Sequence, residues 1–218
     1  MEITEIDRST TVDRVVAMLR QAMFNGDLVP GEPLREIALS QKLRVGRSTI
    51  REALRALVTD GLVARMPNRG LMVRHLTVAE VEDIYTARHL LECGAAQAAA
   101  SCSEAALGEL RRAFEAYEDA AARADTAMAA WAHVEFHAVM VGLTGSQRLA
   151  ETERSLMRDL QLVISTIDRD SDDLPKEIEK HRVLTELFCA RRVEEAIVQL
   201  REDLQHARTF VVRHAAPR

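Results

Sequence analysis

The spacing of apolar residues predicts three helices near the N-terminus. Apolar side chains recur every three to four positions over residues 12–25, the period of an amphipathic helix, with Thr11 as the expected N-cap and Gly26 as the stop. The same period predicts a short helix within residues 34–43 and a third helix over residues 47–60. Only a tight break separates the last two, so together they predict a helix-turn-helix.

A β-hairpin is expected after the third helix. The runs LVARM and LMVRH are strand-like, and the turn sequence Pro67-Asn68-Arg69-Gly70 lies between them. Three helices followed by a hairpin is the element order of a winged helix-turn-helix.

The rest of the chain shows helical patterns without a strand signal. The six predicted helices lie at about 77–100, 103–123, 126–142, 146–168, 174–190 and 193–214. Thr77 and Glu80 have the spacing of a capping box, and Trp131 and Phe136 are expected in the core. Because short connections favour antiparallel packing, the expected fold is mainly α. It combines a winged helix-turn-helix at 1–75 with an all-α antiparallel six-helix bundle at 76–218.

Charge divides the chain at this boundary. Residues 1–75 hold 12 Lys and Arg against nine Asp and Glu, whereas residues 76–218 hold 17 against 25. The positive excess is concentrated in residues 35–74, which contain nine basic and three acidic residues. The overall net charge of -5 therefore conceals a basic N-terminal part that suits nucleic-acid phosphates.

Composition disfavours several other classes of protein. No apolar run reaches the roughly 20 residues of a membrane span, and the N-terminus lacks the pattern of a secretory signal. The three cysteines form no CxxC pair, which argues against a disulfide framework or a thiolate zinc finger. We expect a cytoplasmic protein with no membrane association.

The third helix and the hairpin tip carry side chains suited to DNA. Two arginines one turn apart can face the duplex together, and Arg reads guanine through two hydrogen bonds. Neighbouring hydroxyls and a basic hairpin tip add contacts to phosphate or the minor groove. The alternative is that these arginines only solvate an exposed face. The candidate DNA-binding residues are Arg47, Ser48, Thr49, Arg51, Arg69 and Gly70.

Histidines are concentrated in the second part of the chain. His133 and His137 are four residues apart on one predicted helix, a spacing that lets two imidazoles share a metal ion. His181 lies on a later helix, and Asp203 and His206 lie on the last one. Three helices of a bundle can bring such groups together around a divalent ion. The alternative is that the histidines are packed and that no metal is bound.

Two segments resemble a known family. One segment of the chain is PGEPLREIALSQKLRVGRSTIREALRALVTDGLVARMPNRGLMV. It resembles the winged-helix domain of GntR-family bacterial transcription regulators, which share its PGxxLxE start, its REAL helix and its NRG turn. The opening helix of the FadR-type effector domain (FCD) is similar to TVAEVEDIYTARHLLECGAAQAAA, including its Arg-x-x-x-Glu at Arg88 and Glu92. Six predicted helices indicate the shorter, VanR-like branch.

The resemblance implies a ligand-responsive transcription regulator. Such a protein binds a pseudo-palindromic DNA operator as a homodimer, and residues 76–218 would be its effector-binding and dimerisation domain. Repression relieved by ligand is the commoner outcome in this family, so a repressor is expected. The chain has Gly46-Arg47-Ser48-Thr49 where the family commonly has Ser-Arg-Thr-Pro, and Ile37 where an Arg is frequent. The preferred operator sequence therefore does not follow from the resemblance.

The resemblance also implies a metal site. Matched position by position, the implied ligands are His133, His137, His181 and Asp203, with His206 as a substitute or an outer partner. Zn²⁺ suits this donor set, with Ni²⁺ or Mn²⁺ as alternatives.

A small carboxylate effector would complete the shell of the metal, with Arg88 as its cationic partner. The alternative role of Arg88 is a helix pair with Glu92. Two other functions stay open: a regulator with a metal-free effector pocket, and a metal-dependent enzyme tethered to DNA. The sequence contains no HExxH motif and no nucleophile elbow, so no catalytic residue is assigned and no enzyme activity is expected.

Overall fold

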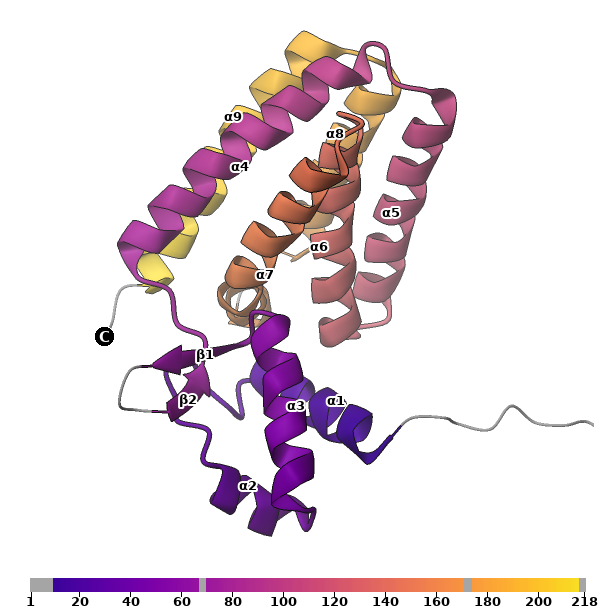
Figure 1. Ribbon diagram of the computed structural model, residues 1–218. Coiled ribbons are helices and arrows are strands. Elements are labelled where there is room, and N and C mark those ends of the chain that lie inside the picture. The colour runs from indigo at the N-terminus through magenta and orange to yellow at the C-terminus, as the bar shows by residue number, and fades with distance from the viewer. Residues whose placement is uncertain (1–9, 67–69, 171–173, 216–218) are drawn as a thin grey trace, which may run out of the picture. The chain divides into compact units, whose positions relative to one another are not determined.

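The computed structural model describes residues 10–66, 70–170 and 174–215 of the chain (Figure 1). The chain divides into two compact units, Met1–Arg74 and His75–Arg218. The described part of the first unit consists of helices and a small hairpin, and that of the second of long helices (Figure 1).

The first unit begins with α1 (Thr11–Phe24). Its N-cap is Thr10, so the expected cap at Thr11 was wrong by one residue. The reason is a capping box: the Thr10 hydroxyl accepts a hydrogen bond from the Asp13 backbone N–H at 3.1 Å, and the Asp13 carboxylate accepts one from the Thr10 N–H at 2.8 Å.

The other two helices of this unit are α2 (Glu36–Leu43) and α3 (Arg47–Thr59). The apolar face of α3 is buried and packs with α1, as the spacing predicts. Its four buried residues are Ile50, Ala53, Leu54 and Leu57. This packing leaves the opposite face of α3 open to solvent.

The wing is an antiparallel hairpin of β1 (Val63–Met66) and β2 (Gly70–Val73). Val63 pairs with Val73 at one end and Met66 with Gly70 at the other. Gly70 has φ of 79°, a conformation that favours glycine. The predicted hairpin is therefore confirmed, while its turn residues 67–69, including the candidate Arg69, lie outside the described residues.

The second unit consists of long helices with short connections. Its elements are α4 (Val78–Ala99), α5 (Glu104–Ala122), α6 (Thr126–Gly142), α7 (Gln147–Asp170), α8 (Leu174–Cys189) and α9 (Val193–Ala215). They agree with the six predicted helices to within two residues at each end, and the capping box of Thr77 with Glu80 is present. Helices α4 and α9 run side by side, as do α5 and α6 (Figure 1). None of the described helices has the length and apolar character needed to span a membrane.

Two apolar clusters form the core of this unit. One gathers around Phe114, Phe136 and Phe188, and the other around Tyr85 and Met157. Trp131 does not join them, because its side chain is 53% exposed, so the expectation for this residue was wrong. Helix α6 is apolar around most of its circumference, and spacing alone therefore did not define its buried face.

Candidate DNA interface and metal centre

The start of α3 presents its polar residues to solvent. Arg47, Ser48 and Arg51 are exposed and Thr49 is half-buried. Gly46 is the N-cap and has no side chain to bond the first amides of the helix. Free amides and exposed arginines at a helix N-terminus suit the phosphates and base edges of a DNA groove.

Arg51 is held in place by a residue that the sequence analysis did not single out. Its Nε and Nη2 atoms donate to the two carboxylate oxygens of Glu36, at 3.3 Å and 3.0 Å. This two-point contact links α3 to α2 and orients the plane of the Arg51 guanidinium. A gap of 15 residues between the partners leaves no periodic signal in the sequence.

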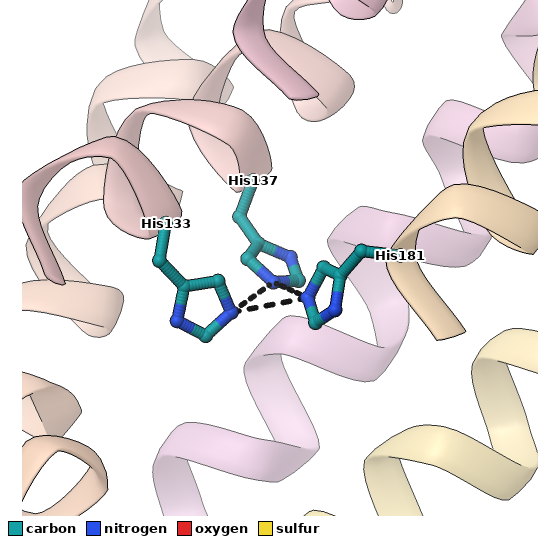
Figure 2. Close-up of side chains that lie close together, drawn as sticks. All are labelled: His133, His137 and His181. Carbon is teal, nitrogen blue, oxygen red and sulfur yellow. Dashed lines mark hydrogen bonds between the residues drawn. The ribbon is translucent and has the colours of Figure 1, made fainter. Parts of the chain in front are cut away.

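Three histidines from two helices converge on one point in the second unit. Helix α6 supplies His133 and His137, and α8 supplies His181 (Figure 2). Their Nε2 atoms lie 3.1 Å, 3.1 Å and 3.2 Å from one another. Figure 2 shows the three rings turned toward this common point.

The partners on the far side of two rings bear on which nitrogen carries the proton. His181 donates from Nδ1 to the Glu177 carbonyl oxygen at 2.6 Å. The Nδ1 atom of His137 lies 3.3 Å from Oε1 of Glu92. Arg88 donates to that same oxygen at 2.7 Å, and its Nη2 atom also lies 3.3 Å from Nδ1 of His137. His181 therefore presents an unprotonated Nε2 to the common point, whereas Nδ1 of His137 faces both an acceptor, Glu92, and a donor, Arg88.

The histidines are neutral near pH 7. Burial lowers the pKa of His137 to about 4, although Glu92 opposes the shift. Burial also lowers the pKa of His133 and of His181. The ring of Tyr117 stacks on His133 with 4.8 Å between centroids and so restrains its orientation.

The three nitrogens have the chemistry and spacing of a metal site. Ligand nitrogens at about 2.0–2.1 Å from a tetrahedral ion are about 3.3 Å apart, close to the separations of the Nε2 atoms. His181 directs an Nε2 lone pair at the common point, and a cation would satisfy that lone pair. The donor set therefore fits a divalent transition ion.

Asp203 and His206 lie on α9, in the wall of the cavity that contains the three histidines. The Asp203 carboxylate accepts hydrogen bonds from the Gln199 side chain at 3.0 Å, and burial raises the pKa of this carboxyl group. The side chain of His206 is exposed. Among the described residues, the ligand atoms that lie within 4.8 Å of one another are those of the three histidines and of a second group, Glu92, His137 and Glu153.

Arg88 is buried between two carboxyl groups. Its guanidinium donates to Glu92 at 2.7 Å and to Glu153 at 3.1 Å, and it lines the same cavity as the histidines. Burial favours the neutral form of Glu92, but Arg88 and His137 overcome this and lower its pKa to about 2. Burial and the charge of Glu92 raise the pKa of Glu153 to about 8. One arginine thus balances one carboxylate, and Glu153 stays protonated at neutral pH. The sequence analysis missed Glu153, because nothing in the spacing of α7 marks it.

The cavity joins polar and apolar walls. Its volume is about 110 Å³. Polar groups come from α4, α6, α8 and α9, and include the histidine cluster and Asp203. The two cations of the lining are each paired with a carboxylate, Arg88 with Glu92 and Lys180 with Glu177. Leu184 of α8 and Leu200, Leu204 and Phe210 of α9 add apolar side chains to the lining. A small, partly apolar molecule suits this lining, and an anionic group on it would need the charge of a bound cation.

Comparison with known proteins identifies both units. Residues 11–73 match the family of bacterial regulatory proteins named gntR, and residues 83–206 match the FCD domain. The Nta operon transcriptional regulator of Aminobacter aminovorans is 31% identical over 168 residues, which cover 76% of this chain and 78% of that protein. The HTH-type transcriptional repressor RspR of Escherichia coli is 31% identical over 99 residues, which cover 45% of this chain and 43% of RspR.

A solved structure has the same fold over nearly the whole length. The crystal structure of a GntR transcriptional regulator from Rhodococcus sp. RHA1 matches with a TM-score of 0.73 and 27% identity, covering 96% of this chain and 100% of that one. These relatives are transcription regulators and not enzymes. The chain therefore belongs to the GntR family of bacterial regulatory proteins and is a DNA-binding transcription regulator with an FCD effector domain.

Proposed function

We propose that this regulator is a repressor controlled by a small carboxylate that binds at a divalent metal centre. The observation that carries the proposal is the convergence of three imidazole Nε2 atoms to within 3.2 Å of one another. The His181 ring is held in the metal-binding tautomer by the Glu177 carbonyl oxygen on its far side.

The proposed ligands are His133, His137, His181 and Asp203, with Zn²⁺ as the ion. Asp203 would have to leave Gln199 to join these ligands, and His206 would be the substitute on the same helix. A bound ion would supply positive charge for the carboxylate oxygens of the effector. The chain itself supplies a rigid triad and an apolar wall for the rest of the molecule.

Arg88 is proposed to contact the effector carboxylate, while its charge also balances that of Glu92. It lies in the cavity wall and already holds Glu92, so it keeps a fixed position before the effector arrives. The effector then favours one arrangement of the bundle and changes the spacing of two recognition helices in a homodimer on a pseudo-palindromic operator. The base contacts are assigned to Arg47, Ser48, Thr49 and Arg51, with Arg69 and Gly70 at the wing.

Elemental analysis of the protein purified without a metal-affinity tag tests the metal centre. We expect about one transition ion per chain, lost in His133→Ala, His181→Ala and Asp203→Ala. His89→Ala is the matched control, because His89 lies on α4 and does not line the cavity. If the parent protein holds no metal, or if all three variants keep it, the proposed centre is wrong and the regulator works with a metal-free pocket.

A further inference from the structure

A second cavity adjoins the histidine cluster. Its volume is about 180 Å³, and its wall comes from α5, α6, α7 and the start of α8. It shares Tyr117, His133 and Ile164 with the first cavity. A molecule in either cavity therefore contacts the same three side chains, one of which is a proposed metal ligand.

The lining of the second cavity differs in charge from that of the first. The first contains Arg88 and Lys180 beside Glu92, Glu177 and Asp203, whereas the described residues around the second include no Lys or Arg. Much of its wall is alanine from α5, α6 and the turn between them. Its one acidic group, Asp125, is engaged as the N-cap of α6, where its Oδ1 accepts from the Met128 N–H at 3.0 Å. A buried anion would find no balancing charge here.

Gln161 is the unexplained polar group of this cavity. Its side chain is 9% exposed, it lies in the cavity wall, and its amide makes no hydrogen bond with any described residue. Thr185, which is also buried, shows the usual arrangement, because its hydroxyl donates to the His181 carbonyl oxygen at 2.7 Å. Its amide atoms are not among the fully enclosed polar atoms of the described residues, so they face the open space of the cavity. An amide both donates and accepts, so a neutral hydroxyl or amide of a ligand can satisfy it.

We propose that the second cavity binds an uncharged, largely apolar group that hydrogen-bonds to Gln161 through one hydroxyl or amide function. The space admits on the order of ten non-hydrogen atoms. This inference rests on the proposed function: the uncharged group is the far end of the effector whose carboxylate would lie at the metal. The effector class is then a monocarboxylate with a neutral polar end, and diacids are disfavoured because their second charge would be buried without a partner. A separate uncharged molecule is the other source of the same chemistry.

Isothermal titration of the full-length, Zn²⁺-loaded protein tests this selectivity. The probes are pentanoate, 5-hydroxypentanoate and glutarate, their six-carbon counterparts, and butan-1-ol as an unlinked alcohol. At one of the two lengths the hydroxy acid should bind about fivefold more tightly than the plain acid, the value of one net hydrogen bond. The diacid should bind at least about tenfold more weakly than the hydroxy acid.

Gln161→Leu should abolish the preference for the hydroxyl while leaving the plain acid bound. Gln161→Met serves if the leucine variant does not fold, as judged by its circular dichroism. Gln147→Leu is the matched control, because Gln147 is exposed on the same helix and lies outside this cavity. Loss of the preference in Gln161→Leu alone supports the proposal. Equal binding of plain and hydroxy acids, tighter binding of the diacid, or a preference that survives Gln161→Leu overturns it.

The two proposals fail in different ways. If no acid binds more tightly with Zn²⁺ than after chelation, the metal-held carboxylate is wrong. The second cavity is then decided by butan-1-ol, whose affinity should fall about fivefold in Gln161→Leu. An alcohol affinity that the substitution leaves unchanged overturns the cavity assignment as well.

Discussion

Replacing Glu153 by Gln should stabilise the protein at neutral pH, although it removes a residue that contacts a buried arginine. Glu153 is fully buried beside Arg88 and Glu92. Two ionised carboxylates against one guanidinium would leave an unbalanced negative charge in the interior. Protonation of Glu153 avoids this charge, and Gln mimics the protonated acid in shape while never needing a proton.

The magnitude follows from the shift in pKa. The folded pKa of Glu153 is about 8, above its ordinary value of 4.5, so folding takes up a proton from solution between these values. This proton uptake lowers the free energy of unfolding; the loss is absent below pH 4.5 and grows as pH rises towards 8. At pH 7 it amounts to about 3 kcal/mol, at about 1.4 kcal/mol per pH unit. In Glu153→Gln this cost disappears, and the melting temperature should rise by roughly 6–12 °C at pH 7.

Thermal unfolding by circular dichroism at pH 5 and pH 7, with a chelator present, measures the effect. The gain should shrink to about 1 kcal/mol or less at pH 5. Glu151→Gln, an exposed change on the same helix, should leave stability within about 0.5 kcal/mol at both values. If Glu153→Gln destabilised the protein at pH 7, Glu153 would be an ionised partner of Arg88 and the reasoning would be refuted.

Three further predictions concern DNA and metal. Arg47→Ala should weaken operator binding by about 1–3 kcal/mol and relax preference at one base pair, as measured by selection from a randomised duplex library; equal loss on all sequences would make Arg47 a phosphate contact. Glu36→Gln should relax preference at the base pair that Arg51 reads, because the guanidinium loses its bidentate partner. Glu52→Gln removes the same charge from α3 without touching Arg51 and should keep the preference; identical selected motifs for both variants would disprove the positioning role. Glu92→Gln should weaken Zn²⁺ binding by about 10- to 100-fold in competition with a chromophoric chelator, since His137 loses the carboxylate that orients it.

The local elements of this protein could be read from short stretches of sequence. Helix α3 was predictable because its apolar residues repeat at the helical period and all lie on the side that is buried. The hairpin followed from two strand-like runs around a turn sequence with glycine. Helix α6 resisted the same treatment, since residues on nearly every side of it are apolar, and Trp131 was assigned to the wrong face.

The candidate sites were predictable only in part. Spacing placed His133 and His137 on one helical face, because residues four apart lie one above the other. That His181 completes a triangle of nitrogens depends on how α8 packs against the bundle, which is a long-range property.

What the sequence determined by itself is the order of the elements, the division of charge and the residue types available for DNA and metal. These follow from interactions within a few turns of the chain, and periodicity records them. Only the tertiary structure decided that Glu36 holds Arg51, that Glu153 is protonated beside Arg88 and that Gln161 lacks a partner. Each of these depends on burial and on contacts between residues that are far apart along the chain. Neither leaves a local pattern in the sequence.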